Sequence, residues 1–146
     1  MKAIIFIGIQ ASGKTTFFEQ NLEAGFVRIS MDELHNRNKE RRLVQECVEA
    51  GKDFVIDNTN PTREDRQRYL SLVSGTGYEV DAYFFQSRVQ DCVRRNQERG
   101  ETVPAKAIAA TSNRLEQPSY EEGFDHIKYV AIKENGYEIS DWEDQK

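Results

Sequence analysis

The chain has 146 residues, enough for one domain with a hydrophobic core, and its charged and apolar fractions are ordinary for a globular protein. Its formal net charge of −5 gives no overall positive field toward nucleic acid, so only local basic patches could attract it. No apolar run approaches the length of a membrane span and the two cysteines lack metal-ligand spacing, so we expect a cytoplasmic protein with reduced thiols and no membrane partner.

The first predicted elements are a buried strand, a phosphate-binding loop and a helix. The unbroken apolar run Ala3–Ile7 suits a strand that is buried on both faces. Gly8–Thr15 then fits the P-loop pattern G-x-x-x-x-G-K-[ST], and a helix is expected from Thr16. Backbone N–H groups at a helix N-terminus bind anions, so this stretch predicts a phosphate site. A glycine-containing turn that matches by chance is the alternative, which the flanking strand and helix disfavour.

The P-loop pattern assigns roles to individual residues. Gly8 and Gly13 allow the backbone to curl around phosphate. Lys14 would reach the outer phosphates of ATP, and the hydroxyl of Thr15 would ligate Mg²⁺. The residues expected to bind ATP are Gly8, Gln10, Ala11, Ser12, Gly13, Lys14, Thr15 and Thr16.

Apolar strand-like runs alternate with helical patterns along the rest of the chain. Four further strands are expected at residues 26–30, 53–57, 78–85 and 127–132. Helices are expected from Ser30 to Gly51 and at 62–74, 89–99 and 104–116. The alternation predicts an α/β, three-layer P-loop fold with a five-stranded parallel sheet, forming a single domain over 1–146. The polar stretch 134–146 is expected to be a weakly held acidic extension.

Ligands of open α/β sheets bind at the carboxyl ends of the strands, which makes the predicted strand ends a filter for site residues. The segments at those ends should therefore face one cleft: Gly8–Thr15, Ser30–Asp32, Asp57–Asn60 and Gln86–Arg88.

Two acids in these segments have competing interpretations. Asp32 could accept the proton of a hydroxyl that attacks the γ-phosphate, or it could be a first-turn acid that complements the helix dipole. Glu33 is expected to complete a capping box with Ser30, which leaves both interpretations of Asp32 equally supported. Asp57 ends an apolar strand as a Walker B acid does and would help to hold Mg²⁺, while the alternative is an Asx turn.

Arg95 and Arg99 share one face of the predicted helix at 89–99, next to a glycine linker. They could close over the ATP phosphates as part of a lid. Ion pairs from Asp91 to Arg95 and from Arg94 to Glu98 are the alternative, which spacing alone favours.

The combination of motifs resembles the kinase domain of polynucleotide 5′-hydroxyl kinases and the small P-loop kinases around it. No GTPase signature follows the P-loop, which leaves a kinase or an ATPase. The resemblance rests on five segments in the same order as in the family: Gly8–Thr15, Ser30–Asp32, Ile56–Pro61, Arg94–Gly100 with Val103 and Pro104, and Glu116–Asp125.

The resemblance implies roles for the residues that match. Asp32 corresponds to the acid that activates the acceptor hydroxyl, and Arg95 and Arg99 correspond to arginines of a helical lid at about 88–116. Phage members of the family carry an arginine three residues after the acid, where this chain has His35, with Arg37 two residues further on. The expected acceptor-binding residues are His35, Arg37, Thr59 and Asn60.

The sequence as a whole predicts an ATP- and Mg²⁺-dependent phosphotransferase with a hydroxyl acceptor. The leading acceptor is a 5′-OH end of DNA or RNA. A small-molecule kinase acting on a sugar, nucleoside or antibiotic is the alternative within enzymes. A nucleotide-binding regulatory or interaction module is the alternative of another class, and the oligomeric state does not follow from the sequence.

Overall fold

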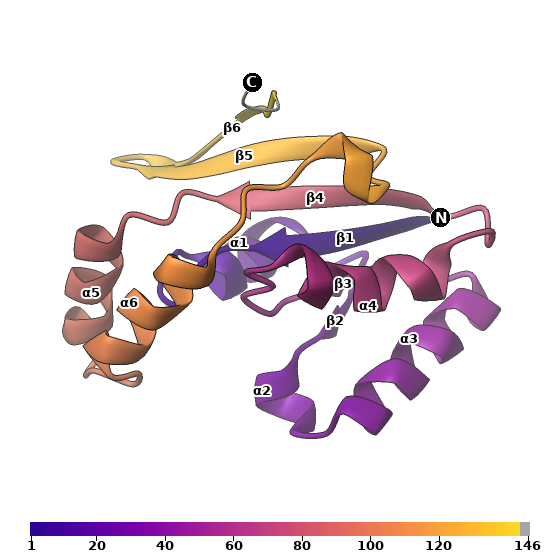
Figure 1. The fold of residues 1–146 in the computed structure, drawn as a ribbon, viewed down its shortest axis with the longest axis horizontal. Helices are drawn as coiled ribbons and strands as arrows, with labels where there is room; N and C mark the ends of the chain where they lie inside the picture. Colours follow the sequence, from indigo (N-terminus) through magenta and orange to yellow (C-terminus); the bar gives the residue numbers. More distant parts are fainter. Residues whose placement is uncertain (144–146) are drawn as a thin grey trace.

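A computed structural model describes residues 1–143, which form one sheet with helices on both faces (Figure 1). The strand order is β2-β3-β1-β4-β5-β6, with neighbouring strands parallel from β2 to β5 and β6 antiparallel to β5. The strands are β1 (Lys2–Ile7), β2 (Val27–Ile29), β3 (Phe54–Ile56), β4 (Glu79–Phe85), β5 (His126–Lys133) and β6 (Gly136–Asp141).

The sixth strand corrects the expected five-stranded parallel sheet and the expected weak extension. β6 pairs with β5 from Lys133 opposite Gly136 to Lys128 opposite Asp141. Trp142 follows it and stacks on the ring of Tyr129 with a centroid separation of 5.3 Å. The expectation for 134–146 is therefore wrong for β6 and Trp142, while residues 144–146 lie outside the described part of the chain.

Within the described residues 1–143, six α-helices connect the strands. They are α1 (Lys14–Asn21), α2 (Met31–Leu34), α3 (Arg37–Ala50), α4 (Arg63–Val73), α5 (Val89–Glu98) and α6 (Ala105–Arg114). The single helix expected from Ser30 to Gly51 is in fact two. His35 takes a left-handed conformation with φ of 56° and ends α2, and the side chain of Asn36 then accepts the backbone N–H groups of Asn38 and Lys39 to begin α3.

The central strand β1 separates two apolar layers because successive side chains of a strand point to opposite faces. Ala3, Ile5 and Ile7 belong to the cluster that α3 and α4 cover, and Ile4 and Phe6 belong to the cluster around α1. A third, small apolar cluster joins Ile9, Cys92 and Ile108, and so packs α5 and α6 against the start of the P-loop. None of the helices within residues 1–143 has the length and hydrophobicity that a membrane span needs.

A buried ion pair holds α4 to the loop before β5. The side chain of Arg66 is fully buried and donates from Nε and Nη2 to the two carboxylate oxygens of Glu122, at 2.7 and 3.0 Å. Its Nη1 also donates to the backbone carbonyls of Asn60 and Glu116, at 3.1 and 3.0 Å. One arginine thus fixes the loop after β3 relative to the segment that leads into β5.

Replacing Arg66 with Ala is expected to lower the free energy of unfolding by about 3–5 kcal/mol, because Glu122 would keep a buried, uncompensated charge. Arg63 lies exposed on the same helix, and its replacement with Ala should change that free energy by less than about 0.5 kcal/mol. Urea unfolding of both variants measures the difference. Equal effects of the two substitutions would show that the buried pair does not stabilise the fold.

Candidate active site

The carboxyl ends of β1, β2 and β3 open onto a cavity of about 480 Å³, here called the P-loop cavity. The side chains that line it come from the P-loop, from α2 and the start of α3, from the loop after β3, and from the segment between α5 and α6. They are Gln10, Ala11, Gly13, Lys14, Thr15, Thr16, Met31, Asp32, Arg37, Asp57, Asn58, Thr59, Arg99, Thr102 and Val103. Most of the predicted site residues therefore lie around one cavity.

The two P-loop glycines are needed for steric reasons. Gly13 has a φ of 93°, and a Cβ there would lie 2.9 Å from Ile132 and 3.0 Å from the hydroxyl of Tyr137. A Cβ on Gly8 would lie 2.8 Å from the hydroxyl of Ser12. The loop is thus packed closely by its own residues and by the β5–β6 hairpin. Gly8 and Ser12 shape the loop and do not themselves line the cavity.

Lys14 lies buried beneath the loop, and its ammonium donates to the carbonyls of Gly8 and Ile9 at 3.0 and 2.8 Å. Burial lowers the pKa of Lys14 from 10.5 to about 8, against the opposing effect of the negative charges of Asp57 and Asp32. A phosphate group in the cavity would supply the negative charge that this buried ammonium lacks.

Thr15 and Asp57 lie together at the floor of the cavity. The hydroxyl of Thr15 donates to Oδ2 of Asp57 at 2.9 Å, and the Asp57 side chain is almost fully buried. Hydroxyl and carboxylate oxygens are the hard ligands that Mg²⁺ takes in nucleotide sites, so this pair fits the metal that the P-loop implies. Arg28 of β2 reaches the same two groups: its Nε donates to Oδ2 of Asp57 at 2.8 Å, and its Nη2 to Thr15 at 3.3 Å.

Asp32 stands in the first turn of α2 with an exposed carboxylate on the cavity. Ser30 caps this helix by accepting the backbone N–H of Asp32 at 3.2 Å. The capping box expected with Glu33 does not form, because the Glu33 carboxylate pairs with Arg28 instead. Within residues 1–143, no side-chain hydrogen bond engages the Asp32 carboxylate, so it is available to a ligand.

The four expected acceptor-binding residues separate into two groups. Arg37 and Thr59 line the cavity. His35 is exposed outside it, at the junction of α2 and α3. Asn60 is buried and its amide donates to the carbonyl of Phe6 at 2.8 Å, so it ties the loop after β3 to β1 and does not line the cavity where an acceptor would bind.

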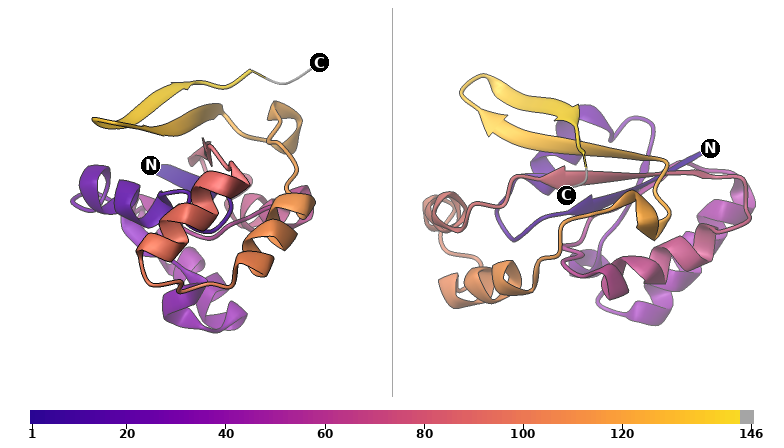
Figure 2. Two further views of the ribbon diagram at one scale, coloured as in Figure 1. Left: turned by 90° about the vertical axis from the view of Figure 1, so that its left-hand side faces the viewer. Right: turned by 45° about the horizontal axis from the view of Figure 1, so that its top comes forward.

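The helices α5 and α6 lie side by side at the end of the molecule that carries the P-loop (Figures 1 and 2). Arg95 donates to the carbonyl of Ala11 at 3.1 Å, and Arg99 lines the cavity. The ion pair expected between Asp91 and Arg95 is absent from the described residues, because Asp91 pairs with Arg94 at 3.3 Å. Both arginines thus face the P-loop, as a phosphate-contacting lid requires.

Replacing Arg95 or Arg99 with Ala is expected to lower turnover by about 10–100-fold, the equivalent of one lost hydrogen bond to a charged group. The melting temperature should change little, because Arg99 is exposed and Arg95 is only half-buried. Arg94→Ala removes an exposed arginine of the same helix and should keep full turnover. If all three variants turned over at the wild-type rate, Arg95 and Arg99 would be surface residues without a role at the phosphates.

A polar network that the sequence did not predict lies beneath the cavity. Residues 35–42 contain no apolar side chain, a pattern that predicts a solvent-facing stretch, yet Glu40 is buried. Its carboxylate accepts from Arg37 at 2.8 Å, from Asn58 at 2.9 Å and from the hydroxyl of Tyr69 at 3.0 Å. Asn58 in turn accepts the backbone N–H of Met31 at 2.9 Å. The network therefore fixes Arg37 and the start of α2 relative to the end of β3.

A second missed contact comes from the far end of the chain. Tyr137 of β6 donates its hydroxyl to the carbonyl of Gly13 at 2.9 Å, and its ring meets Phe17 edge to face. No local pattern near Tyr137 points to the P-loop, because 124 residues separate the two groups along the chain. The C-terminal hairpin thus supports the phosphate-binding loop directly.

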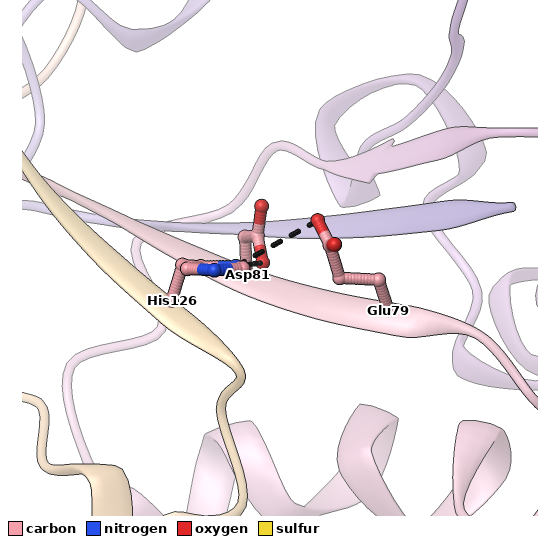
Figure 3. A group of neighbouring side chains, drawn as sticks. All are labelled: Glu79, Asp81 and His126. Atoms are coloured by element: carbon pink, nitrogen blue, oxygen red, sulfur yellow. Dashed lines mark hydrogen bonds and ion pairs between the residues drawn. The ribbon is translucent and has the colours of Figure 1, made fainter.

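A separate charged cluster lies at the opposite edge of the sheet, where β4 and β5 begin (Figure 3). Nδ1 of His126 lies 3.1 Å from Asp81 and 3.8 Å from Glu79. These three side chains could together hold a cation, but the ammonium of Lys2 already lies 3.1 Å from Glu79 and 3.4 Å from Asp81. Burial raises the pKa of Asp81. We interpret the cluster as an ion-pair network that joins the starts of β4 and β5.

The fold and the cavity define a class of protein. A P-loop between a central parallel strand and a helix, a Walker-type threonine–aspartate pair and a helix pair with two arginines facing the loop are the parts of a small P-loop kinase. The model of the AAA domain family (AAA_33) matches residues 36–118, more than half of the chain, and the chain belongs to this family.

Two curated relatives identify the branch of the class. The chain is 28% identical over 136 residues to the bifunctional polynucleotide phosphatase/kinase of Schizosaccharomyces pombe, covering 89% of this chain and 33% of the relative. It is 32% identical over 139 residues to the putative bifunctional polynucleotide phosphatase/kinase of Acanthamoeba polyphaga mimivirus, covering 88% and 33%. The expected resemblance to polynucleotide kinase-like P-loop kinases is confirmed, and the chain spans about a third of the length of these relatives.

Solved structures agree on the fold. A chain of the Pnkp1/Rnl/Hen1 RNA repair complex superposes with a TM-score of 0.69 at 20% identity, covering 78% of this chain and 43% of that one. A sugar kinase from Janibacter sp. HTCC2649 superposes with a TM-score of 0.70 at 17% identity, covering 90% and 85%. Both confirm an α/β P-loop kinase fold. At these identities neither structure indicates which acceptor this chain phosphorylates.

Proposed function

We propose that this chain is an ATP-dependent kinase domain that transfers the γ-phosphate of ATP to the 5′-hydroxyl end of DNA or RNA. The observation that carries the proposal is the placement of Asp32. A carboxylate without a capping or ion-pair partner lines the same cavity as the P-loop lysine. A protein that only binds a nucleotide has no use for such a base. The names of the two curated relatives support the nucleic-acid acceptor.

The side chains of the cavity suggest a division of labour. Lys14 would exchange its two carbonyl partners for the ATP phosphates, with Arg95 and Arg99 acting as a lid over them. Thr15 and Asp57 would hold Mg²⁺, which when bound neutralises phosphate charge. The two buried, unpaired cysteines fit a reducing compartment, and we place the protein in the cytoplasm on that ground.

The transfer step needs one proton acceptor. As the acceptor oxygen bonds to the γ-phosphorus and the bond to the ADP oxygen breaks, the hydroxyl proton would pass to Asp32. Lys14 and the two lid arginines would balance the negative charge on the transferred group. Catalysis would therefore depend mainly on positioning and charge.

The start of α3 favours a polyanionic acceptor over a sugar. Arg37 lines the cavity, and Lys39, Arg41 and Arg42 are exposed on the same first turns of the helix. Cations at a helix N-terminus oppose the helix dipole, so helix stability does not explain them. Arg37 already pairs with Glu40, and phosphates of a nucleic-acid strand extending from the cavity would give the exposed Lys39, Arg41 and Arg42 a partner.

Transfer from [γ-³²P]ATP to a panel of 5′-OH DNA, 5′-OH RNA, nucleosides and sugars tests the proposal. The expected result is labelling of 5′-OH oligonucleotides, with an acceptor affinity that falls as salt rises. Labelling of a nucleoside or sugar alone would make the protein a small-molecule kinase. ATP binding without labelling of any acceptor would leave a nucleotide-binding module.

A further inference from the structure

The guanidinium of Arg28 occupies the position between the two groups that fit a metal. It donates from Nε to Oδ2 of Asp57 at 2.8 Å and from Nη2 to the Thr15 hydroxyl at 3.3 Å. Oδ2 is also the atom that accepts the hydrogen bond of Thr15. Arg28 therefore binds the same two oxygen-bearing groups that a divalent cation at this site would use.

The environment of Arg28 holds it in this position. Its side chain is only 18% exposed, and that of Asp57 is 2% exposed. The carboxylate of Glu33 binds Nη1 of the same guanidinium from the start of α2. A hydrogen bond between charged groups in such a partly buried place contributes far more than an exposed ion pair. Displacing the guanidinium from Asp57 thus has an appreciable cost.

The position of Arg28 on β2 is not explained by packing alone. The backbone of β2 pairs with β3 through Val27, Arg28 and Ile29, whichever side chain stands in the middle. The strand ends one residue later at Ile29, so a long side chain at this point reaches directly to the floor of the P-loop cavity. The Arg28 guanidinium therefore lies at Thr15 and Asp57, where it can compete with a bound Mg²⁺ for the same oxygen atoms.

We propose that Arg28 competes with Mg²⁺ for Asp57 and Thr15, and so raises the Mg²⁺ concentration that the protein needs to bind its nucleotide. This inference rests on the proposed function and adds a residue that sets its metal requirement. When Mg²⁺ binds, the guanidinium leaves Oδ2 of Asp57 and keeps its contact with Glu33. No bond to phosphorus changes in this exchange, so it is a binding step that precedes transfer.

The test measures the affinity of the full chain for a fluorescent ADP analogue over a series of Mg²⁺ concentrations. Arg28→Gln should lower the Mg²⁺ concentration at the half-maximal effect by about tenfold, the equivalent of one lost hydrogen bond between charged groups. Because free ADP binds Mg²⁺ equally in every sample, the shift reports on the protein. Arg94→Gln, an exposed arginine paired with Asp91, is the matched control and should leave the midpoint unchanged.

A second readout does not involve a nucleotide. Mg²⁺ should raise the melting temperature of Arg28→Gln more than that of the wild type, because the uncompensated Asp57 then gains its missing cation. Should Arg28→Gln not fold, Arg28→Lys retains a cation with a single contact point and should shift the midpoint in the same direction by a smaller factor.

The direction in which Arg28→Gln shifts the Mg²⁺ midpoint shows whether Arg28 competes with the metal. A midpoint in Arg28→Gln that equals or exceeds the wild-type value would overturn it, since Arg28 would then hold Asp57 in place for the metal. If the wild type bound no ADP analogue at any Mg²⁺ concentration, the proposed function would be wrong and this inference with it. The two failures are therefore distinguishable in one experiment.

Discussion

Replacing Asp32 with Asn is expected to lower the rate of phosphoryl transfer by about 10²–10⁴-fold, while folding and ATP binding survive. Asn keeps the size of the side chain and most of its hydrogen-bonding shape but cannot take a proton. The backbone N–H of Asp32, which the Ser30 hydroxyl accepts, is unchanged by the substitution. The effect should therefore appear in transfer alone.

Asp65 provides the matched control. It lies in the first turn of α4, with its backbone N–H accepted by the capping Thr62, as that of Asp32 is by Ser30. If Asp32 only complements a helix dipole, Asp32→Asn and Asp65→Asn should each lower stability by about 0.3–1 kcal/mol and leave transfer intact. Transfer rate, ATP affinity and melting temperature measured on both variants separate a base from a first-turn acid. Full transfer by Asp32→Asn would remove the base from the mechanism.

The positions of the site acids Asp32 and Asp57 could be predicted because the ends of the strands follow from local patterns. An apolar run before the P-loop fixes β1, and the end of every parallel strand meets the same edge of the sheet. Asp32 and Asp57 follow their strands by at most three residues, so the rule placed both near Lys14, and the structure does the same.

The direction of side chains within a loop could not be predicted in this way. Asn58 and Asn60 lie in the loop after β3 and carry the same amide, yet Asn58 lines the cavity and Asn60 is buried against β1. A left-handed backbone at Asn60, with φ of 45°, accompanies the difference. Such a conformation depends on what the loop packs against, here Arg66 and Gly8, which lie elsewhere in the sequence.

The other features that could not be predicted depend on contacts between segments that are far apart in the sequence. β6 is largely exposed, and its alternation of apolar and polar residues covers only Tyr137–Ser140 within the polar stretch 134–146, too short a signal for the strand to be predicted. It is held by backbone pairing with β5, by Trp142 and by the bond from Tyr137 to Gly13. Arg28 and Glu40 look like ordinary strand and helix charges in the sequence. Only their three-dimensional partners, Asp57 for one and Tyr69 for the other, identify them as parts of the site.

Replacing Lys14 with Met is expected to abolish detectable ATP binding and transfer without lowering the melting temperature. The buried ammonium is the cation of the P-loop, and without it the loop itself offers the phosphates only backbone dipoles. Calorimetry of ATP binding measures the first part. Lys52→Met, an exposed lysine outside the cavity, is the control and should bind ATP as the wild type does. Equal ATP affinity of Lys14→Met and wild type would reject the phosphate role.

The expectation that Lys14→Met does not lower the melting temperature follows from the pKa of Lys14. Burial lowers this pKa from 10.5 to about 8, so folding disfavours the charged form by on the order of 3 kcal/mol. Below pH 8 the lysine is charged in both states and the full penalty applies. Between about pH 8 and 10.5 the folded protein releases the proton first, and the penalty is relieved as pH rises.

Melting temperatures at pH 7 and pH 9.5 therefore test whether Lys14 carries this penalty. Met fills the same space without a charge, so Lys14→Met should melt no lower than the wild type at pH 7. The difference in melting temperature between Lys14→Met and the wild type should shrink at pH 9.5, where Lys14 of the folded wild type is largely neutral. A Lys14→Met protein that melted lower at pH 7 would mean that the hydrogen bonds to Gly8 and Ile9 outweigh the burial of charge. The P-loop would then be held in shape by the lysine that is expected to bind phosphate.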